Sequence, residues 1–194
     1  MRTFITAAYR SVGKGTGGRG KPWRPADVNG VLVEPQRNNW SCGPAALRYC
    51  LLVHGIDKNV AQLARLAGST RSGTDERKLI RAARRLGCKL ANHQRRSPVT
   101  ARRLIETKLK LGVPLILCVE KWQHWIAVLH KSKKGFLVFD SNRPGPVIRL
   151  RSWKWVERRL RLLPTPRYQA FFKHNRSPIY SILSLSRPVQ RRRR

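Results

Sequence analysis

Acidic side chains are scarce in this chain of 194 residues, which has nine Asp and Glu residues against 42 Lys and Arg. The formal net charge of +33 is far beyond what solubility requires, and its self-repulsion disfavours a compact monomer. An anionic partner that neutralises this charge is therefore expected. Nucleic acid fits this expectation best, and an acidic protein or an anionic lipid surface is the alternative.

Long apolar runs, paired cysteines and base-reading motifs are also missing. No apolar run is long enough to span a bilayer, so no membrane span is expected. Without a helix-turn-helix, zinc finger or RNA-reading aromatic motif, the basic residues are expected to contact phosphates rather than bases. Cysteine occurs without CxxC spacing or a secretory segment, which disfavours zinc sites and disulfides and suits a reducing compartment inside the cell. No metal and no cofactor are expected. The four cysteines are Cys42, Cys50, Cys88 and Cys118.

The length and the 41% hydrophobic content suit one domain with a single core. We predict a basic Gly/Pro/Arg-rich arm over residues 1–30, the folded domain over residues 31–186, and an Arg-rich tail over residues 187–194. Helical patterns come first and strand patterns second, which indicates the α+β class. The predicted helices begin at Cys42, after Asp57 or Asn59, after Thr74, at Thr100 and at residue 152, and the predicted strands cover 113–119, 124–131, 135–140, 147–150 and 179–186.

Cys42 is predicted to begin a helix. Apolar residues after it recur at spacings of three and four until Gly55, and Pro44 falls in the first turn, where proline is tolerated. At a helix N-terminus, unpaired N–H groups and the positive end of the helix dipole favour the reactive thiolate. A cysteine followed by Gly-Pro at a helix start is an odd choice for core packing, so Cys42 is interpreted as a nucleophile.

A predicted hairpin brings a histidine next to a carboxylate. The apolar runs HWIAVL and GFLVFD are joined by the polar HKSKK, which indicates two antiparallel strands and a tight turn. A turn centred near Ser132 would place His124 directly opposite Asp140 on one face, with Cβ atoms about 5 Å apart. This pairing predicts a base beside its orienting carboxylate, with Asn142 as the alternative orienter.

The order of these features resembles a known family. The residues that carry the resemblance are Gln36 six positions before Cys42, Gly43 and an alanine-rich helix after it, the segment GTDERKLIRAARRLG, the apolar strand VPLILCV, His124 followed by Trp125, and a strand ending in Asp140. In these features the chain from Gln36 to about Arg161 resembles the double-glycine leader peptidases, the bacteriocin-processing branch of the papain-like cysteine peptidases.

The resemblance implies a papain-like fold, in which a helical N-terminal half packs on an antiparallel sheet from the C-terminal half. It also implies that Cys42 attacks a peptide carbonyl, that His124 acts as general base and then acid, and that Asp140 holds the imidazole tautomer. Gln36 would donate a hydrogen bond to the oxyanion.

Two positions depart from the pattern of the resembled family. Ser41 stands before the cysteine, where that family usually has aspartate. Ser141 follows Asp140, where proline is usual.

Two function classes follow from these residues. The first is an active cysteine peptidase that cleaves a protein or peptide substrate while bound to nucleic acid, or within a nucleic-acid-containing assembly such as a virion or nucleoid. The second is an idle peptidase-like fold that serves as a basic structural or nucleic-acid-binding component of a virion, nucleoid or ribonucleoprotein. The complete set of four site residues favours the first. In either class, phosphates of DNA or RNA are predicted to contact Arg19, Lys21, Arg24, Arg84, Arg85, Arg95, Arg96, Arg102, Arg103, Arg191, Arg192, Arg193 and Arg194.

Overall fold

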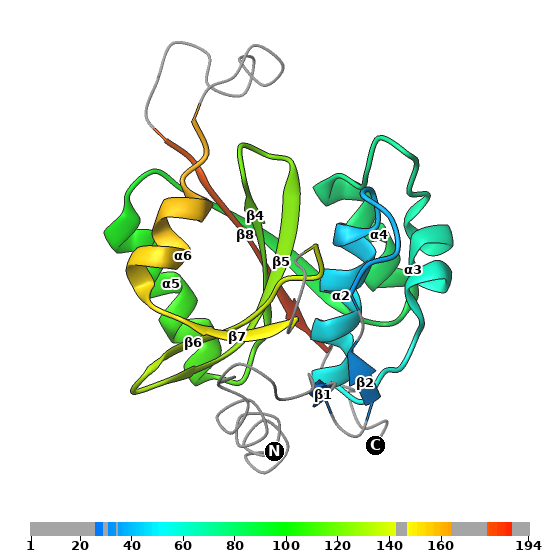
Figure 1. The fold of residues 1–194 in the computed structure, drawn as a ribbon, viewed down its shortest axis with the longest axis horizontal. Coiled ribbons are helices and arrows are strands. Elements are labelled where there is room, and N and C mark those ends of the chain that lie inside the picture. Colours follow the sequence, from blue (N-terminus) through cyan, green and yellow to red (C-terminus); the bar gives the residue numbers. More distant parts are fainter. Residues whose placement is uncertain (1–25, 29–30, 34, 143–146, 164–177, 188–194) are drawn as a thin grey trace, which may run out of the picture.

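Figure 1 shows the chain as a central sheet with helices on both sides. The structure, a computed structural model, describes residues 26–28, 31–33, 35–142, 147–163 and 178–187. The elements in chain order are β1 (Ala26–Val28), β2 (Val31–Val33), α2 (Cys42–Val53), α3 (Val60–Ala67), α4 (Glu76–Arg85), β3 (Lys89–Arg95), α5 (Pro98–Lys110), β4 (Leu115–Val119), β5 (His124–Ser132), β6 (Gly135–Phe139), β7 (Ile148–Arg151), α6 (Trp153–Leu160) and β8 (Tyr180–Ser186).

Six strands form one antiparallel sheet in the order β3-β8-β4-β5-β6-β7. The strand β8 comes last in the chain but lies between β3 and β4, and it pairs with both of them. The strands β1 and β2 form a separate two-stranded hairpin. Helices combined with an antiparallel sheet confirm the predicted α+β class.

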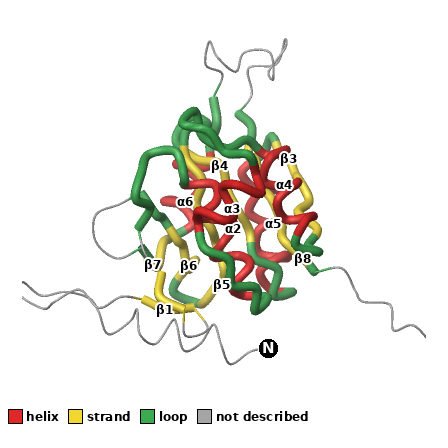
Figure 2. Tube along the Cα trace, turned by 90° about the vertical axis from the view of Figure 1, so that its right-hand side faces the viewer, coloured by secondary structure: helices red, strands yellow, loops and turns green. Residues whose placement is uncertain are grey.

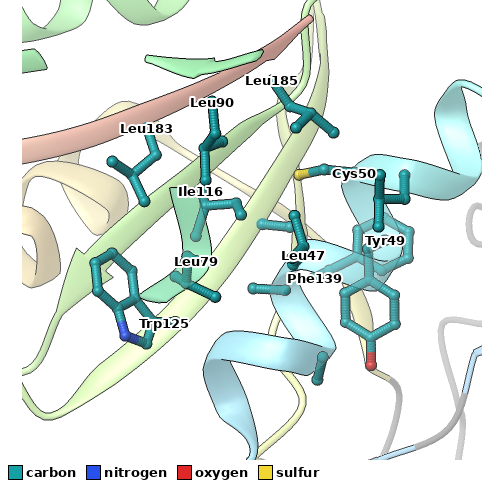
Figure 3. Packing of buried hydrophobic residues seen from close by; sticks show 14 of the residues in the cluster. Leu47, Tyr49, Cys50, Leu79, Leu90, Ile116, Trp125, Phe139, Leu183 and Leu185 are labelled. Carbon is teal, nitrogen blue, oxygen red and sulfur yellow. The ribbon is translucent and has the colours of Figure 1, made fainter. Parts of the chain in front are cut away.

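Helices cover both faces of the sheet. On one face, α2, α3 and α4 pack through a cluster that includes Leu47, Leu79 and Ile116, shown close up in Figure 3. On the other face, α5 and α6 pack through a second cluster, which includes Leu115 and Leu117. Successive residues of β4 therefore serve opposite clusters, as the alternation of side chains along a strand requires. Figure 2 views the molecule from the side that α2, α3 and α4 cover.

The start of α3 is fixed by a reciprocal capping box. The Asn59 side chain accepts a hydrogen bond from the Gln62 backbone N–H at 2.9 Å, and the Gln62 side chain accepts from the Asn59 N–H at 3.0 Å. Each bond satisfies a backbone donor that the helix itself leaves unpaired. Of the two predicted caps, Asp57 and Asn59, the helix therefore uses Asn59.

The predicted cap of α4 is wrong by one residue. The Asp75 side chain, not that of Thr74, accepts from the first-turn N–H of Lys78 at 2.8 Å. Thr74 is engaged elsewhere, because its hydroxyl lies 2.7 Å from the Ser69 hydroxyl and its carbonyl accepts from the Trp125 indole at 2.8 Å. The carboxylate of Asp75 is also the better partner for the positive end of the helix dipole.

The strand β3 was not predicted from the sequence. Its sequence KLANHQR lacks β-branched residues, and Leu90 is its one buried residue. The strand lies at the edge of the sheet and pairs along its whole length with β8. Tertiary pairing therefore overrides a weak local preference for strand. The helix α5 begins at Pro98, two residues before its predicted start, with proline in the first turn.

Most of the predicted arm and tail lies outside the described residues. Within the arm, β1 is described and pairs with β2, so the predicted boundary after residue 30 falls inside this hairpin. Of the tail, only Arg187 is described. Among the helices that the structure describes, none is both long enough and apolar enough to cross a membrane.

The turn between β5 and β6 lies slightly later than predicted. Ser132 pairs with Gly135, so the loop consists of Lys133 and Lys134. Gly135 has a φ of +142°, and a Cβ there would lie 2.5 Å from the Arg151 carbonyl oxygen of β7, so only glycine fits.

The pairing register of the hairpin also differs from the prediction. A bulge interrupts the ladder between Val128 and His130, after which Ala127 pairs with Phe139. Asp140 therefore lies just beyond the ladder and is not directly opposite His124. The turn and the bulge together shift the register, and a local sequence pattern specifies neither.

Candidate active site

Cys42 is the first residue of α2, and its side chain is buried, with 4% exposure. Ser41 is the N-cap residue, but its side chain makes no capping hydrogen bond. The first backbone N–H groups of α2 and the positive end of its dipole therefore lie at Cys42.

The residue after Cys42 explains how α2 approaches β5. A Cβ at Gly43 would lie 3.1 Å from the Thr74 Cβ and 3.3 Å from the Trp125 Cδ1, so the glycine allows a closer contact than a residue with a side chain would. Trp125 directly follows His124 and donates its indole N–H to the Thr74 carbonyl. The neighbours of Cys42 and of His124 thus pack against each other, a relation that neither local pattern could predict.

His124 contacts both other members of the predicted triad. Its Nε2 lies 2.8 Å from the Asp140 Oδ1, and its side chain also has a hydrogen-bonding interaction with Cys42. Burial lowers the pKa of His124, but the hydrogen bonds to Asp140 and Cys42 and the charges of both outweigh burial and raise it to about 9. The imidazolium form therefore predominates at neutral pH.

Asp140 reaches His124 from just outside the β5–β6 ladder. Its backbone N–H donates to the Val147 carbonyl at 2.9 Å, and its side chain is buried. Asn142, the alternative orienter, instead donates its backbone N–H to the Asp140 Oδ1 at 3.3 Å. Asn142 therefore contacts the carboxylate rather than the imidazole, and Asp140 is the partner of His124.

Gln36 is tied to the segment that follows Asp140. Its backbone N–H donates to the Ser141 carbonyl at 2.9 Å, and its side-chain Oε1 accepts from the Ser141 hydroxyl at 2.7 Å. The Gln36 Nε2 donates to the Asn38 carbonyl at 2.8 Å and, over a longer 3.3 Å, to the Asn142 Oδ1. The Ser141 hydroxyl thus fixes which end of the amide carries the donor. The sequence did not reveal that Ser141 would orient the Gln36 amide.

The comparison with protein families identifies the family of this chain. The sequence model of the Peptidase C39 family matches residues 31–149, which is more than half of the chain. The chain belongs to the Peptidase C39 family. C39 peptidase domains are cysteine peptidases, and so is this chain. This confirms the resemblance to the double-glycine peptidases.

Solved C39 structures share the fold. The peptidase domain of Streptococcus ComA, a bifunctional ABC transporter, has 20% identity and a TM-score of 0.55, over 80% of this chain and 97% of that one. The C39-like domain of a toxin secretion ATP-binding protein from Vibrio parahaemolyticus has 12% identity and a TM-score of 0.51, over 79% and 99%. A double-glycine motif protease from an AMS/PCAT transporter, solved with its leader peptide, has 18% identity and a TM-score of 0.50, over 88% and 96%. These likenesses confirm the papain-like fold. A comparison with curated proteins finds no match.

One arginine beside the C39 site was not anticipated from the sequence. Arg159 on α6 forms an ion pair with Glu120, and its Nη2 lies 3.8 Å from the Asp140 Oδ2. It lies beyond the residues that the family model matches, among 42 basic residues that the sequence alone does not distinguish. No local signal could have marked it.

The other cysteines of the C39 domain lie in environments that oppose ionisation. Burial raises the pKa of the Cys50 and Cys118 thiols, and for Cys118 the nearby charges of Glu76 and Cys42 raise it further. Burial also raises the pKa of Cys88, against the opposing charge of Arg187. All four cysteines are free thiols. In the described part of the chain, no group of three or more His, Cys, Asp or Glu side chains could hold a metal ion.

Of the predicted phosphate-contacting residues that the structure describes, four lie on helices on opposite sides of the sheet. Arg84 and Arg85 end α4, on one side of the sheet, whereas Arg102 and Arg103 lie on α5, on the other side. These four side chains are exposed, although Arg85 also donates to the Leu66 carbonyl at 3.0 Å and Arg102 pairs with Glu106 at 2.9 Å.

The remaining predicted contacts lie at the end of β3 or outside the described residues. Arg95 is half-buried and Arg96 is exposed. The predicted contacts outside the described part of the chain are Arg19, Lys21, Arg24, Arg191, Arg192, Arg193 and Arg194.

Proposed function

We propose that Cys42, His124 and Asp140 are the catalytic triad of this peptidase and that Gln36 stabilises the oxyanion. The observation that carries this proposal is the position of His124, which is hydrogen-bonded to Asp140 at 2.8 Å and also to Cys42. A buried imidazolium between a carboxylate and a thiol is the arrangement that a thiolate nucleophile requires. Membership of the C39 family supports the same assignment.

The reaction follows from these contacts in two halves. The Cys42 thiolate attacks the peptide carbonyl carbon, and the oxygen gains a negative charge that the Gln36 amide stabilises. The tetrahedral intermediate collapses as the C–N bond breaks and His124 gives its proton to the leaving amine, which leaves a thioester. Neutral His124 then takes a proton from water, the hydroxide attacks the thioester, and the C–S bond breaks to restore the thiolate and imidazolium.

We infer a peptide substrate with two glycines before the scissile bond. The AMS/PCAT relative is described as a double-glycine motif protease and was solved with its leader peptide. In this chain, Trp125 belongs to the same buried cluster as Cys42, and Trp122 packs against that cluster. Small residues next to the scissile bond suit such a setting.

The test of the triad compares two cysteine variants on a fluorogenic peptide with a Gly-Gly cleavage site. Cys42→Ala should abolish cleavage, whereas Cys88→Ala should retain it, because Cys88 lies outside the site. Iodoacetamide near neutral pH should label Cys42 selectively, since burial raises the pKa of the other three thiols. Cleavage by the Cys42 variant, or equal labelling of all four cysteines in the folded chain, would remove Cys42 from the mechanism.

We further propose that the peptidase acts while bound to nucleic acid through phosphate contacts. The net charge of +33 supports this proposal, together with exposed arginines on α4, after β3 and on α5. Because these arginines lie on both sides of the sheet, the partner would have to wrap around the domain or bind in several copies. A nucleoprotein particle or virion in a reducing compartment remains the predicted location.

Salt dependence separates nucleic acid from other anionic partners. If six to ten phosphates are neutralised at once, duplex DNA affinity should fall about 10³- to 10⁵-fold between 50 and 200 mM salt, with little dependence on sequence. Removal of residues 1–25 and 188–194 should flatten this slope and leave peptide cleavage intact. Undetectable or salt-independent binding of both DNA and RNA at low salt would favour an acidic protein or an anionic lipid instead.

A further inference from the structure

A strained turn leads directly into the catalytic strand. Glu120, Lys121 and Trp122 have φ values of 54°, 55° and 72°, so three consecutive residues with side chains adopt the left-handed conformation. The turn is closed by a hydrogen bond from the Gln123 N–H to the Glu120 carbonyl at 3.1 Å, and His124 follows at once. Such backbone is unfavourable for residues other than glycine and persists only where the surroundings hold it.

Arg159 holds the first residue of this turn in two ways. Its backbone carbonyl accepts from the Glu120 N–H at 3.2 Å, and its guanidinium forms an ion pair with the Glu120 carboxylate. One residue of α6 therefore fixes both the main chain and the side chain at the point where the chain enters the turn.

The same guanidinium faces the catalytic carboxylate. The Asp140 Oδ1 lies 2.8 Å from the His124 Nε2, while its other oxygen, Oδ2, lies 3.8 Å from the Arg159 Nη2. Both side chains of the Asp140–Arg159 pair are largely buried, with 7% and 14% exposure. In a site shielded from water, such a pair restricts the rotation of the carboxylate.

The environment keeps the guanidinium in place and charged. Its Cζ lies 4.8 Å from the centre of the Trp155 ring, close enough for a cation–π contact. Burial lowers the pKa of Arg159 from its ordinary value, but an arginine beside two carboxylates remains cationic at neutral pH. A lysine could not reproduce this geometry, because its single ammonium cannot stack on the ring and also reach both carboxylates.

We propose that Arg159 is a positioning residue for peptide cleavage, which holds His124 through the left-handed turn and Asp140 through its second carboxylate oxygen. The imidazole is thereby fixed from both of its neighbours. This inference rests on the proposed triad. Arg159 lies on α6, outside the segment 31–149 that the C39 family model matches.

The test uses Arg159→Gln and Arg159→Lys in the full chain, with Arg158→Gln as the matched control. Arg158 is an exposed neighbour on the same helix, so its loss removes the same charge without touching the site. Arg159→Gln should lower kcat about 10- to 100-fold and change KM less than about threefold. The misplaced His124 and Asp140 act in the chemical step and not in substrate binding. The lysine variant should fall between, and the control should match the parent chain.

A double-mutant cycle separates positioning from a general loss of stability. In an Asp140→Asn background, which removes the charge that Arg159 faces, Arg159→Gln should cost much less than it does in the parent chain. Thermal unfolding of each variant shows which are folded at the assay temperature. If Arg159→Gln is unfolded there, Arg159→Lys replaces it in the cycle, and Glu120→Gln tests the ion pair from its other side.

The results overturn the inference if kcat of Arg159→Gln stays within about twofold of the parent, or if its loss is the same with and without the Asp140 carboxylate. Failure of the triad itself gives a different result, because Cys42→Ala would then still cleave the peptide.

Discussion

The two helical layers contribute to the site by different physical means. The layer of α2, α3 and α4 supplies Cys42 through close apolar packing, in which Gly43 leaves just enough room for Thr74 and Trp125. The layer of α5 and α6 supplies charge, through Arg159 against Asp140 and Glu120. The first layer should therefore be sensitive to added volume and the second to altered charge, and the strands β5 and β6 join the two.

The hydrogen bond between Ser141 and Gln36 ties the segment before α2 to the residues that follow β6. After substitution of Cys42, changes at these two residues should cause the largest loss of kcat. Gln36→Ala should lower kcat about 10²- to 10³-fold, the usual loss for one oxyanion donor. Ser141→Ala should lower kcat about tenfold by leaving the amide free to rotate, and it should add nothing to Gln36→Ala.

Steady-state kinetics of the three variants check this coupling. Ser184→Ala is the control, because it removes a buried hydroxyl that bonds His93 at 2.9 Å rather than a site residue. Additive losses in the double variant would mean that Ser141 does not act through Gln36.

A smaller effect is expected from added volume in the apolar layer. Gly43→Ala places a methyl group 3.1 Å from the Thr74 Cβ and 3.3 Å from the Trp125 Cδ1, so α2 or these neighbours must move by a few tenths of an ångström. We expect a loss of stability of about 1 to 3 kcal/mol and a fall in kcat/KM of about tenfold, measured by urea unfolding and peptide cleavage. Full activity in a destabilised variant would show that the distance between Cys42 and His124 tolerates this shift.

The smallest effect is expected from pH in the neutral range. Because the pKa of His124 is raised from 6.5 to about 9, its protonated form stabilises the fold fully below pH 6.5, and this contribution is lost as the pH rises toward 9. The alkaline limb of kcat/KM should likewise fall near pH 9, where the imidazolium loses its proton. Asp140→Asn should move that limb to lower pH, and an unmoved limb would mean that another group controls it.

Features written into local patterns were predictable from the sequence. The apolar spacing after Cys42 defines α2, and the alternation of apolar and polar runs defines the β5–β6 hairpin. The contact between His124 and Asp140 followed from that hairpin, although its register was wrong. The order of the four site residues, together with the motifs around them, identified the family, and the match to the family model confirms it.

Features that depend on contacts between distant segments were not predictable. The strand β3 exists because β8 pairs with it, and no property of KLANHQR demands a strand. The approach of α2 to β5 also depends on Thr74, which belongs to a third segment, just before α4, and packs against Gly43. Arg159 gains its place from the packing of α6, since one arginine among many carries no distinguishing pattern.

The bulge at Leu129 limits how the length of the β5–β6 hairpin can change. Inward and outward positions alternate along a strand, so each residue gained or lost exchanges one face for the other. The pairing of Ser132 with Gly135, continued without interruption, would leave His124 and Asp140 on opposite faces of the sheet. The extra residue at the bulge restores the phase, and Ala127 then faces Phe139. The length of this hairpin can therefore change only in steps of two, unless a bulge is gained or lost with the change.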